Sequence, residues 1–192
     1  MLPGSPLRKQ LYEAWKKAIR QDYCSQRINS ERSLQASFWA QLNKALPSGR
    51  RRMFIEPCVT RGKSHPRHFP DIVICNTVRV IAVIEIKYMP RGLPSSDRDV
   101  DKLRYIAKHR EHLHVSNVRF RGPASDAKVY KFSKDVLLVW AAVHKTPKDS
   151  YESPEVSMLS QGIKELERCF LQLHAETSED AKPRVFARPK VK

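Results

Sequence analysis

Apolar residues recur every three or four positions in two stretches near the start of the chain. The first stretch, residues 7–23, predicts an amphipathic helix. The second, residues 31–46, has the same period and follows Asn29 and Ser30, either of which can cap a helix. The apolar positions are Leu7, Leu11, Trp15 and Ile19 in the first stretch and Leu34, Phe38, Leu42 and Ala45 in the second.

The middle of the chain is rich in Val and Ile and predicts strands. A first strand is expected over residues 53–59, and residues 71–75 and 79–88 form a hairpin around Asn76-Thr77-Val78. Residues 136–143, VLLVWAAV, are apolar throughout, as in a central strand covered on both faces. The stretch from 115 to 132 is ambiguous and is interpreted as two short strands, 117–120 and 128–132.

Two further helices complete the prediction, over residues 97–109 and 154–175. Strands flanked by helices indicate one α/β domain over residues 1–175, in which the helices 7–23 and 154–175 are additions at the ends. Residues 176–192 are basic and rich in Pro, and we expect a mobile tail there.

The net charge of the chain limits the classes of binding partner that are expected. The 192 residues include 36 Lys+Arg and 20 Asp+Glu, a formal net charge of +16. Such a field favours polyanions, with nucleic acid first and an anionic membrane surface second, although solubility alone also explains it. No apolar run approaches the roughly 20 residues that span a bilayer, and the first ten residues have no apolar signal core. The four cysteines form no CxxC pair, so we expect reduced thiols and a cytoplasmic protein without membrane insertion.

The candidate chemistry lies in FPDIVICNTVRVIAVIEIKY, residues 69–88. Side chains alternate along a strand, so Glu85 and Lys87 project from one face and Ile86 from the other. Antiparallel pairing in the hairpin brings Asp71 close to Glu85. Two adjacent carboxylates repel unless a cation lies between them, and oxygen ligands suit Mg²⁺ or Mn²⁺.

Pro70-Asp71 followed by Glu85-Ile86-Lys87 resembles the motif of the PD-(D/E)xK nuclease superfamily. The resemblance implies a restriction-endonuclease-like core over about residues 30–145, with a central mixed β-sheet flanked by helices on both faces. It also implies that Asp71, Glu85 and the backbone carbonyl of Ile86 bind the metal. Lys87 would then orient the attacking water or help to deprotonate it. The alternative is an ordinary Glu and Lys pair on a half-exposed strand.

Three residues before the motif are further candidates. Glu31 falls within the apolar arc of its helix and would point toward the sheet. Some members of the superfamily use a glutamate of the first core helix as a metal ligand or to hold water, so Glu31 is a candidate for both roles. A first-turn acid stabilised by the helix dipole is the alternative. Gln35 and Glu56 are weaker candidates for the same pocket.

The loop before the motif is basic. Its residues Arg61, Lys63, Arg67 and His68 would contact the nucleic-acid backbone without reading sequence, if Asp71 is at the active centre. A solvated loop is the alternative. Lys102, on the helix after the motif, is expected to be a surface lysine, and contact with the nucleic acid is the alternative.

These observations together predict a divalent-metal-dependent nuclease that hydrolyses phosphodiester bonds of DNA as an endonuclease, with Mg²⁺ or Mn²⁺ as cofactor. Cleavage of a duplex requires two cuts, so a homodimer is expected. One alternative is a non-catalytic DNA- or RNA-binding module of the same fold. Another is a basic protein of a ribosome or membrane surface, whose acids would be solvated and insensitive to metal.

Overall fold

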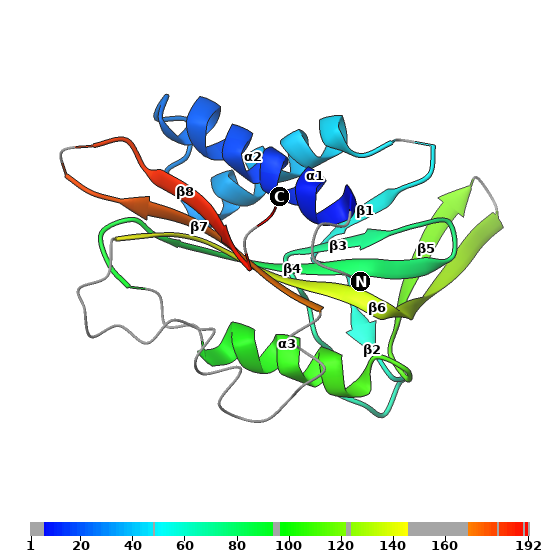
Figure 1. Cartoon of the computed structure of the whole chain (residues 1–192). Helices are drawn as coiled ribbons and strands as arrows, with labels where there is room; N and C mark the ends of the chain where they lie inside the picture. The colour runs from blue at the N-terminus through cyan, green and yellow to red at the C-terminus, as the bar shows by residue number, and fades with distance from the viewer. Residues whose placement is uncertain are drawn as a thin grey trace.

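A mixed eight-stranded sheet forms the centre of the molecule, and helices cover both of its faces (Figure 1). The predicted α/β fold class is therefore confirmed. The computed structural model describes residues 6–47, 49–93, 97–121, 124–145, 169–179, 181–189 and 191. The strands are β1 (Arg52–Ile55), β2 (Val59–Thr60), β3 (Ile72–Cys75), β4 (Arg79–Met89), β5 (His114–Arg121), β6 (Ala124–Lys145), β7 (Phe170–Thr177) and β8 (Arg184–Arg188).

The sheet is organised around β4 and β6, which run parallel. The strand order is β1-β3-β4-β6-β5-β2, and β7 and β8 follow on the other part of β6. β6 is 22 residues long, so its first half pairs with β5 and its second half with β7. The predicted hairpin is confirmed as β3 and β4, and the Asn76 side chain accepts hydrogen bonds from the amides of Val78 and Arg79 in its turn.

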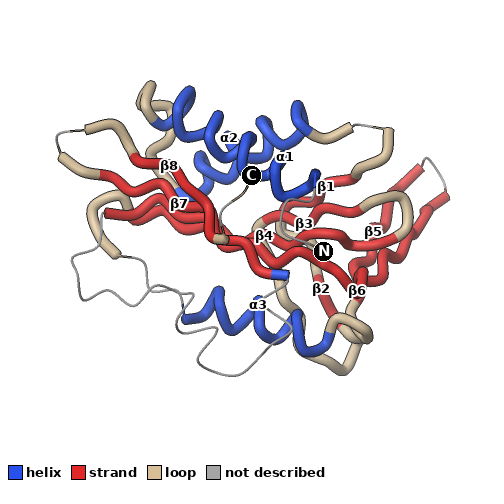
Figure 2. Tube along the Cα trace, viewed as in Figure 1, coloured by secondary structure: helices blue, strands red, loops and turns tan. Residues whose placement is uncertain are grey.

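Three predicted helices are confirmed, and they cover the two faces of the sheet (Figure 2). The sheet therefore separates two layers of the core. On one face lie α1 (Pro6–Lys17), which continues as a π-helix to Tyr23, and α2 (Glu31–Ala45). On the other face lies α3 (Asp97–His109). Ser30 caps α2 and accepts a hydrogen bond from the Ser33 amide, so of the two predicted caps Ser30 is used.

The strand predicted over residues 53–59 is wrong as a single element. It is divided into β1 and β2 at Glu56, whose φ is 46°. A non-glycine residue with positive φ turns the chain, and Pro57 has no amide hydrogen to donate to a neighbouring strand. β1 then pairs with β3, whereas β2 pairs with β5.

The two short strands predicted between 115 and 132 are also corrected. Residues 114–121 form β5, and residues 124–145 form one continuous strand that includes the predicted central strand 136–143. The polar residues Ser133, Lys134 and Asp135 interrupt the apolar pattern where β6 changes partners, so the sequence suggested a break there.

The end of the chain differs most from its prediction. Within the predicted helix 154–175, residues 154–168 lie outside the described residues, and residues 170–175 belong to strand β7. Phe170 and Leu173 are three residues apart, as on one face of a helix, so this short segment fits a helical period as well as a strand. The basic tail contains β8, which pairs antiparallel with β7, and Arg184 and Arg188 lie over the Phe186 ring at 5.0 and 5.5 Å.

None of the helices that the structure describes is long and apolar enough to cross a membrane. The four cysteines are free thiols, as expected from the sequence.

Candidate active site

The candidate site forms where β3 ends and β4 continues without it. β3 starts at Ile72, which pairs with Ile84, so the amides of β4 beyond Glu85 have no strand to bind on this side. Carboxylates take that place. Asp71 Oδ2 accepts a hydrogen bond from the Ile86 amide at 2.6 Å, and Glu31 Oε2 accepts one from the Tyr88 amide at 3.3 Å. The exposed edge of β4 thus collects two acids from different elements.

Asp71 is held in place through its backbone. Its carbonyl accepts hydrogen bonds from the Gln35 side-chain amide at 2.9 Å and from the Glu56 backbone amide at 3.1 Å. Gln35 is buried on α2, and the unusual conformation of Glu56 aims that amide at Asp71. Both residues therefore position Asp71, while the Glu56 side chain is exposed.

Glu85 lies opposite Asp71 and is only 1% exposed. Its Oε2 accepts a hydrogen bond from Lys102 Nζ at 2.6 Å, whereas its Oε1 has no hydrogen-bond partner among the described residues. Burial raises the pKa of Glu85 to about 8, although Lys102 acts in the opposite direction. Burial likewise raises the pKa of Asp71 to about 6, against the hydrogen bond from Ile86. In both carboxyl groups burial disfavours the charged form and favours the protonated one.

Lys87 projects from the same face as Glu85, as the alternation predicts. Its Nζ lies 3.0 Å from Asp99 Oδ2 and 3.9 Å from Glu31 Oε2. Burial lowers the pKa of Lys87, but the hydrogen bond to Asp99 and the charges of Asp99 and Glu31 outweigh it, so the pKa is raised. The Lys87 side chain therefore stays an ammonium ion at neutral pH.

Sequence reasoning missed the contribution of α3. Asp99 and Lys102 are one turn apart on this helix and bind Lys87 and Glu85 respectively. Lys102 was expected to be a surface lysine, but its Nζ is also 3.3 Å from the Phe69 carbonyl and its side chain is mostly buried. The available signal was the position of both residues beside the apolar stripe of the helix, at Val100 and Leu103. Their partners come from packing between distant elements, which no local pattern shows.

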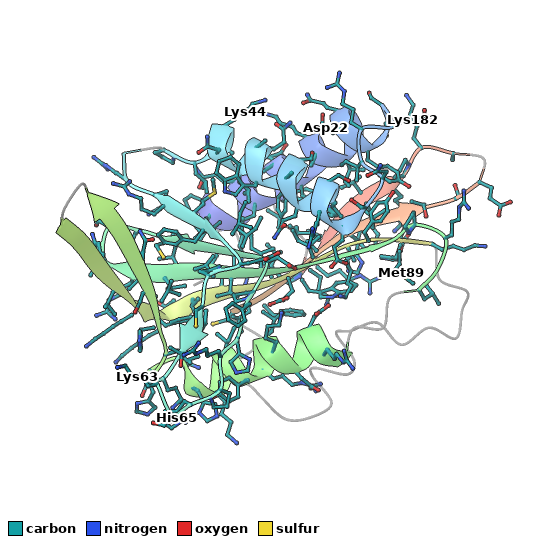
Figure 3. All side chains as sticks on the ribbon, turned by 180° about the vertical axis from the view of Figure 1, so that it is seen from behind. Asp22, Lys44, Lys63, His65, Met89 and Lys182 are labelled. Atoms are coloured by element: carbon teal, nitrogen blue, oxygen red, sulfur yellow. The ribbon has the colours of Figure 1, made fainter. Side chains whose placement is uncertain are left out.

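The residues of the basic loop between β2 and β3 do not all lie at the same place. His68 pairs with Val59 through the backbone, and its ring lies 4.3 Å from that of Tyr105 on α3. Lys63 and His65 project beside the C-terminal end of α3 (Figure 3). Arg67 is exposed and Arg61 is half-buried. The structure therefore brings Asp71, Glu85, Lys87 and Glu31 together and places the tip of the loop apart from them.

The donor set fits a divalent cation that keeps part of its water shell. Among the described residues, no three His, Cys, Asp or Glu side chains are grouped so that they could hold a metal ion by themselves. Mg²⁺ does not need such a cage, because proteins commonly bind it through one or two carboxylates while waters and phosphate oxygens complete the shell. Glu85 Oε1, which has no hydrogen-bond partner among the described residues, and a carboxylate oxygen of the neighbouring Asp71 would supply two such ligands.

Comparison with known proteins gives a likeness in structure alone. No protein-family model matches the sequence, and no curated protein matches it. Among solved structures, cAAA-bound NucC from P. aeruginosa ATCC27853 aligns with a TM-score of 0.48 and 11% identity, over 96% of this chain and 85% of that one. Apo NucC from E. coli MS115-1 aligns with a TM-score of 0.47 and 14% identity, over 97% and 85%. At these identities the similarity concerns the course of the chain and not the residues of the site.

Proposed function

We propose that this protein is a divalent-metal-dependent nuclease of the PD-(D/E)xK type that hydrolyses phosphodiester bonds of DNA as an endonuclease. The observation that carries the proposal is the pair of the half-buried Asp71 and the buried Glu85, one oxygen of which has no hydrogen-bond partner among the described residues. Two adjacent carboxylates with little access to water do not stabilise a fold, so their presence beside two lysines supports a use in chemistry.

Asp71, Glu85 and the Ile86 carbonyl would hold the cation, and Glu31 would hold a water on it. When bound, a divalent cation polarises the phosphodiester and lowers the pKa of its water. Asp71 presents one carboxylate oxygen to the site because the other is fixed by the Ile86 amide. Glu31 is fixed in the same way by the Tyr88 amide, and its side chain is 46% exposed, so solvent reaches it.

Lys87 acts in this proposal as a cation and not as a base. Its raised pKa keeps the ammonium protonated, and Asp99 and Glu31 hold it from two sides. It would offset the negative charge that builds on the phosphate as water attacks phosphorus and the leaving oxygen departs. The exposed Glu31 carboxylate is then the group placed to accept the proton of the attacking water.

The net charge of +16 supports a polyanionic substrate, and the cations of the loop at 61–68 would contact its phosphates. A single set of site residues in the chain cuts one strand at a time. Two copies would cut both strands of a duplex, which supports a homodimer.

The test is cleavage of supercoiled plasmid, branched DNA, single-stranded DNA and RNA, each with Mg²⁺, Mn²⁺ or EDTA. Asp71→Asn and Lys87→Met remove the two charges with little change in shape. Asp101→Asn is the matched control, because Asp101 is an exposed acid on α3 that pairs with Arg104 away from the site. We expect metal-dependent cutting by the wild type and the control, and none by the other two variants.

A non-catalytic DNA- or RNA-binding module is the second candidate, and one observation favours it. Lys102 already neutralises one oxygen of Glu85 at 2.6 Å, as in a site that no longer holds a cation. In that case none of the four proteins cuts any substrate with either metal, and salt-sensitive binding is the same in all of them.

A further inference from the structure

A groove with a volume of about 1090 Å³ lies at the ends of β4, β6 and β7, next to the candidate active site. Two hydrogen bonds tie the strand ends together, from the Lys145 amide to the Gly92 carbonyl and from the Thr177 hydroxyl to the Pro90 carbonyl. The side chains that matter below are Tyr23, Tyr88, Arg91, Lys145, Glu179 and Lys182, all of which line it.

Two tyrosine rings form one wall. Tyr23 and Tyr88 meet edge to face with 6.3 Å between their centroids, and both are half-exposed. The Tyr88 hydroxyl donates a hydrogen bond to the Ile28 carbonyl at 3.2 Å, which fixes that ring. Gln26 and Asn29 add side-chain amides nearby. Aromatic rings beside amide groups are suited to planar ligands with polar edges, such as nucleobases.

Three cations and one acid line the groove beside this wall, counted over the residues that the structure describes. Arg91, Lys145 and Lys182 are exposed at the groove, and none of the three has an ion-pair partner among the described residues. Lys182 and Met89, the neighbour of Tyr88, lie toward one end of the molecule, whereas Lys44 and Lys63 lie toward the other (Figure 3). Among the described lining residues Glu179 is the only acid, and the excess of cations over acids there attracts anions.

The groove is continuous with the candidate site through two elements. The Tyr88 amide donates a hydrogen bond to Glu31 at the edge of β4, and the Tyr88 ring lines the groove on the face of β4 opposite to that of Lys87. Ile28 and Asn29 line the groove immediately before the cap of α2, whose first residue is Glu31. A strand cut between Asp71 and Lys87 would reach the tyrosines by passing round the edge of β4 at Glu31, which contacts both Lys87 and the Tyr88 amide.

We infer that this groove binds an unpaired stretch of the DNA strand next to the scissile phosphate, with bases against Tyr23 and Tyr88 and phosphates on Arg91, Lys145 and Lys182. This inference rests on the proposed nuclease function. A base that stacks on a side chain has left its own duplex, so the groove specifies a substrate class: single strands, overhangs, flaps or opened branches. A fully paired duplex would gain only phosphate contacts there.

The experiment measures binding by fluorescence anisotropy in EDTA, where no cleavage occurs. The probes are a labelled blunt duplex, the same duplex with a single-stranded overhang, and the single strand alone. Tyr23→Leu removes a ring, and Tyr23→Phe is its matched control because it keeps the ring. Arg91→Gln and Lys182→Gln remove charge from the groove, and Lys44→Gln removes the same charge at the other end of the molecule.

We expect the wild type, Tyr23→Phe and Lys44→Gln to bind the overhang more tightly than the blunt duplex. Tyr23→Leu should weaken overhang binding at least about fivefold and leave blunt-duplex binding unchanged. Each charge variant at the groove should reduce the slope of log affinity against log salt on the single strand by about 0.7. Thermal unfolding of each variant verifies that the fold is retained.

Equal affinity of the wild type for both duplexes would overturn the groove assignment, as would equal losses in Tyr23→Leu and Tyr23→Phe. Metal-dependent plasmid cutting that Asp71→Asn abolishes would then still support the nuclease. Conversely, an overhang preference that depends on Tyr23, without cutting of any substrate, would retain the groove as a binding site and refute the nuclease. The two failures are therefore distinguishable.

Discussion

The two faces of the central sheet differ in what they bury. Under α1 and α2 the layer is dominated by apolar side chains, including Trp15 and Phe38 in edge-to-face contact at 5.2 Å. Under α3 an apolar layer is also present, but at the end of β4 it gives way to ionisable side chains, with Glu85 1% and Asp99 8% exposed. Apolar burial stabilises a fold, whereas buried charge opposes folding unless it is paired.

This difference separates the roles of the two faces. The α1/α2 face stabilises the fold. The α3 face contains groups that destabilise it, and they lie at the edge of β4 where carboxylates bind the backbone amides. A buried cluster of charge in an otherwise consistent core is the mark of a functional site. The separation can be tested on each face.

The largest expected effect is on the α3 face. Glu85→Gln should lower metal-dependent cleavage at least about a thousandfold, equivalent to about 4 kcal/mol of transition-state stabilisation. The free energy of unfolding at pH 7 should stay within about 1 kcal/mol of the wild type, because burial keeps Glu85 mostly protonated and an amide has a similar shape. Initial cleavage rates and urea unfolding measure the two quantities. A large loss of stability without a loss of cleavage rate would contradict the assignment of catalysis to the α3 face.

The converse change is on the α1/α2 face. Phe38→Ala should lower the free energy of unfolding by about 3–5 kcal/mol, because Phe38 is fully buried and the ring leaves a cavity against Trp15. The cleavage rate per folded molecule should be unchanged at a temperature where the variant is folded. Val78→Ala is the control, since Val78 is 63% exposed and its loss should scarcely alter stability. Rate losses in Phe38→Ala at full folding would show that the faces are coupled.

The pH dependence of stability should also come from the α3 face. The pKa of Glu85 is about 8 in the folded protein against an ordinary 4.5, so the folded state keeps a proton that the unfolded state has lost. The free energy of unfolding in EDTA should therefore fall as pH rises from about 4.5 to 8, by at most about 1.4 kcal/mol per pH unit. Asp71 contributes in the same direction between 3.8 and about 6.

The difference between the wild type and Glu85→Gln isolates this effect. Burial lowers the pKa of His144, and lowers that of His174 to about 3, so these two residues destabilise the fold as pH falls below their ordinary range. That contribution is common to both proteins and cancels. Urea unfolding at half-unit steps of pH should show a flatter curve for Glu85→Gln above pH 6. Parallel curves would contradict the assignment.

The sequence predicted those parts of the fold that local period determines. The helices at 7–23, 31–46 and 97–109 and the hairpin of β3 and β4 each have a repeat that the structure reproduces. Strand β7 was missed because Phe170 and Leu173 also fit a helical period, and the full length of β6 was missed because polar residues interrupt it where it changes partners. Pairing of β8 with β7 depends on a contact that composition does not show.

The site divides in the same way. The proximity of Asp71 and Glu85 and the common face of Glu85 and Lys87 follow from hairpin pairing and alternation, so the sequence could predict them. Asp99 and Lys102 reach the site only because α3 packs across β4, an arrangement that depends on the whole fold. The placement of the basic loop depends in turn on where β2 joins the sheet.

The smallest expected effect concerns helix α2, which links the two faces. Helix α2 packs on the apolar face, yet its first residue, Glu31, reaches Lys87 and Tyr88. Ser30→Ala removes the cap of α2 and should lower the free energy of unfolding by about 1 kcal/mol. If the position of Glu31 depends on that cap, the cleavage rate should fall by about fivefold as well, and Ser30→Asp, which can still cap, should restore both quantities. A loss of stability at constant rate would mean that the cap does not determine the position of Glu31, which the Tyr88 amide and Lys87 would then hold without it. The stability of α2 and the chemistry of the candidate site would then be independent.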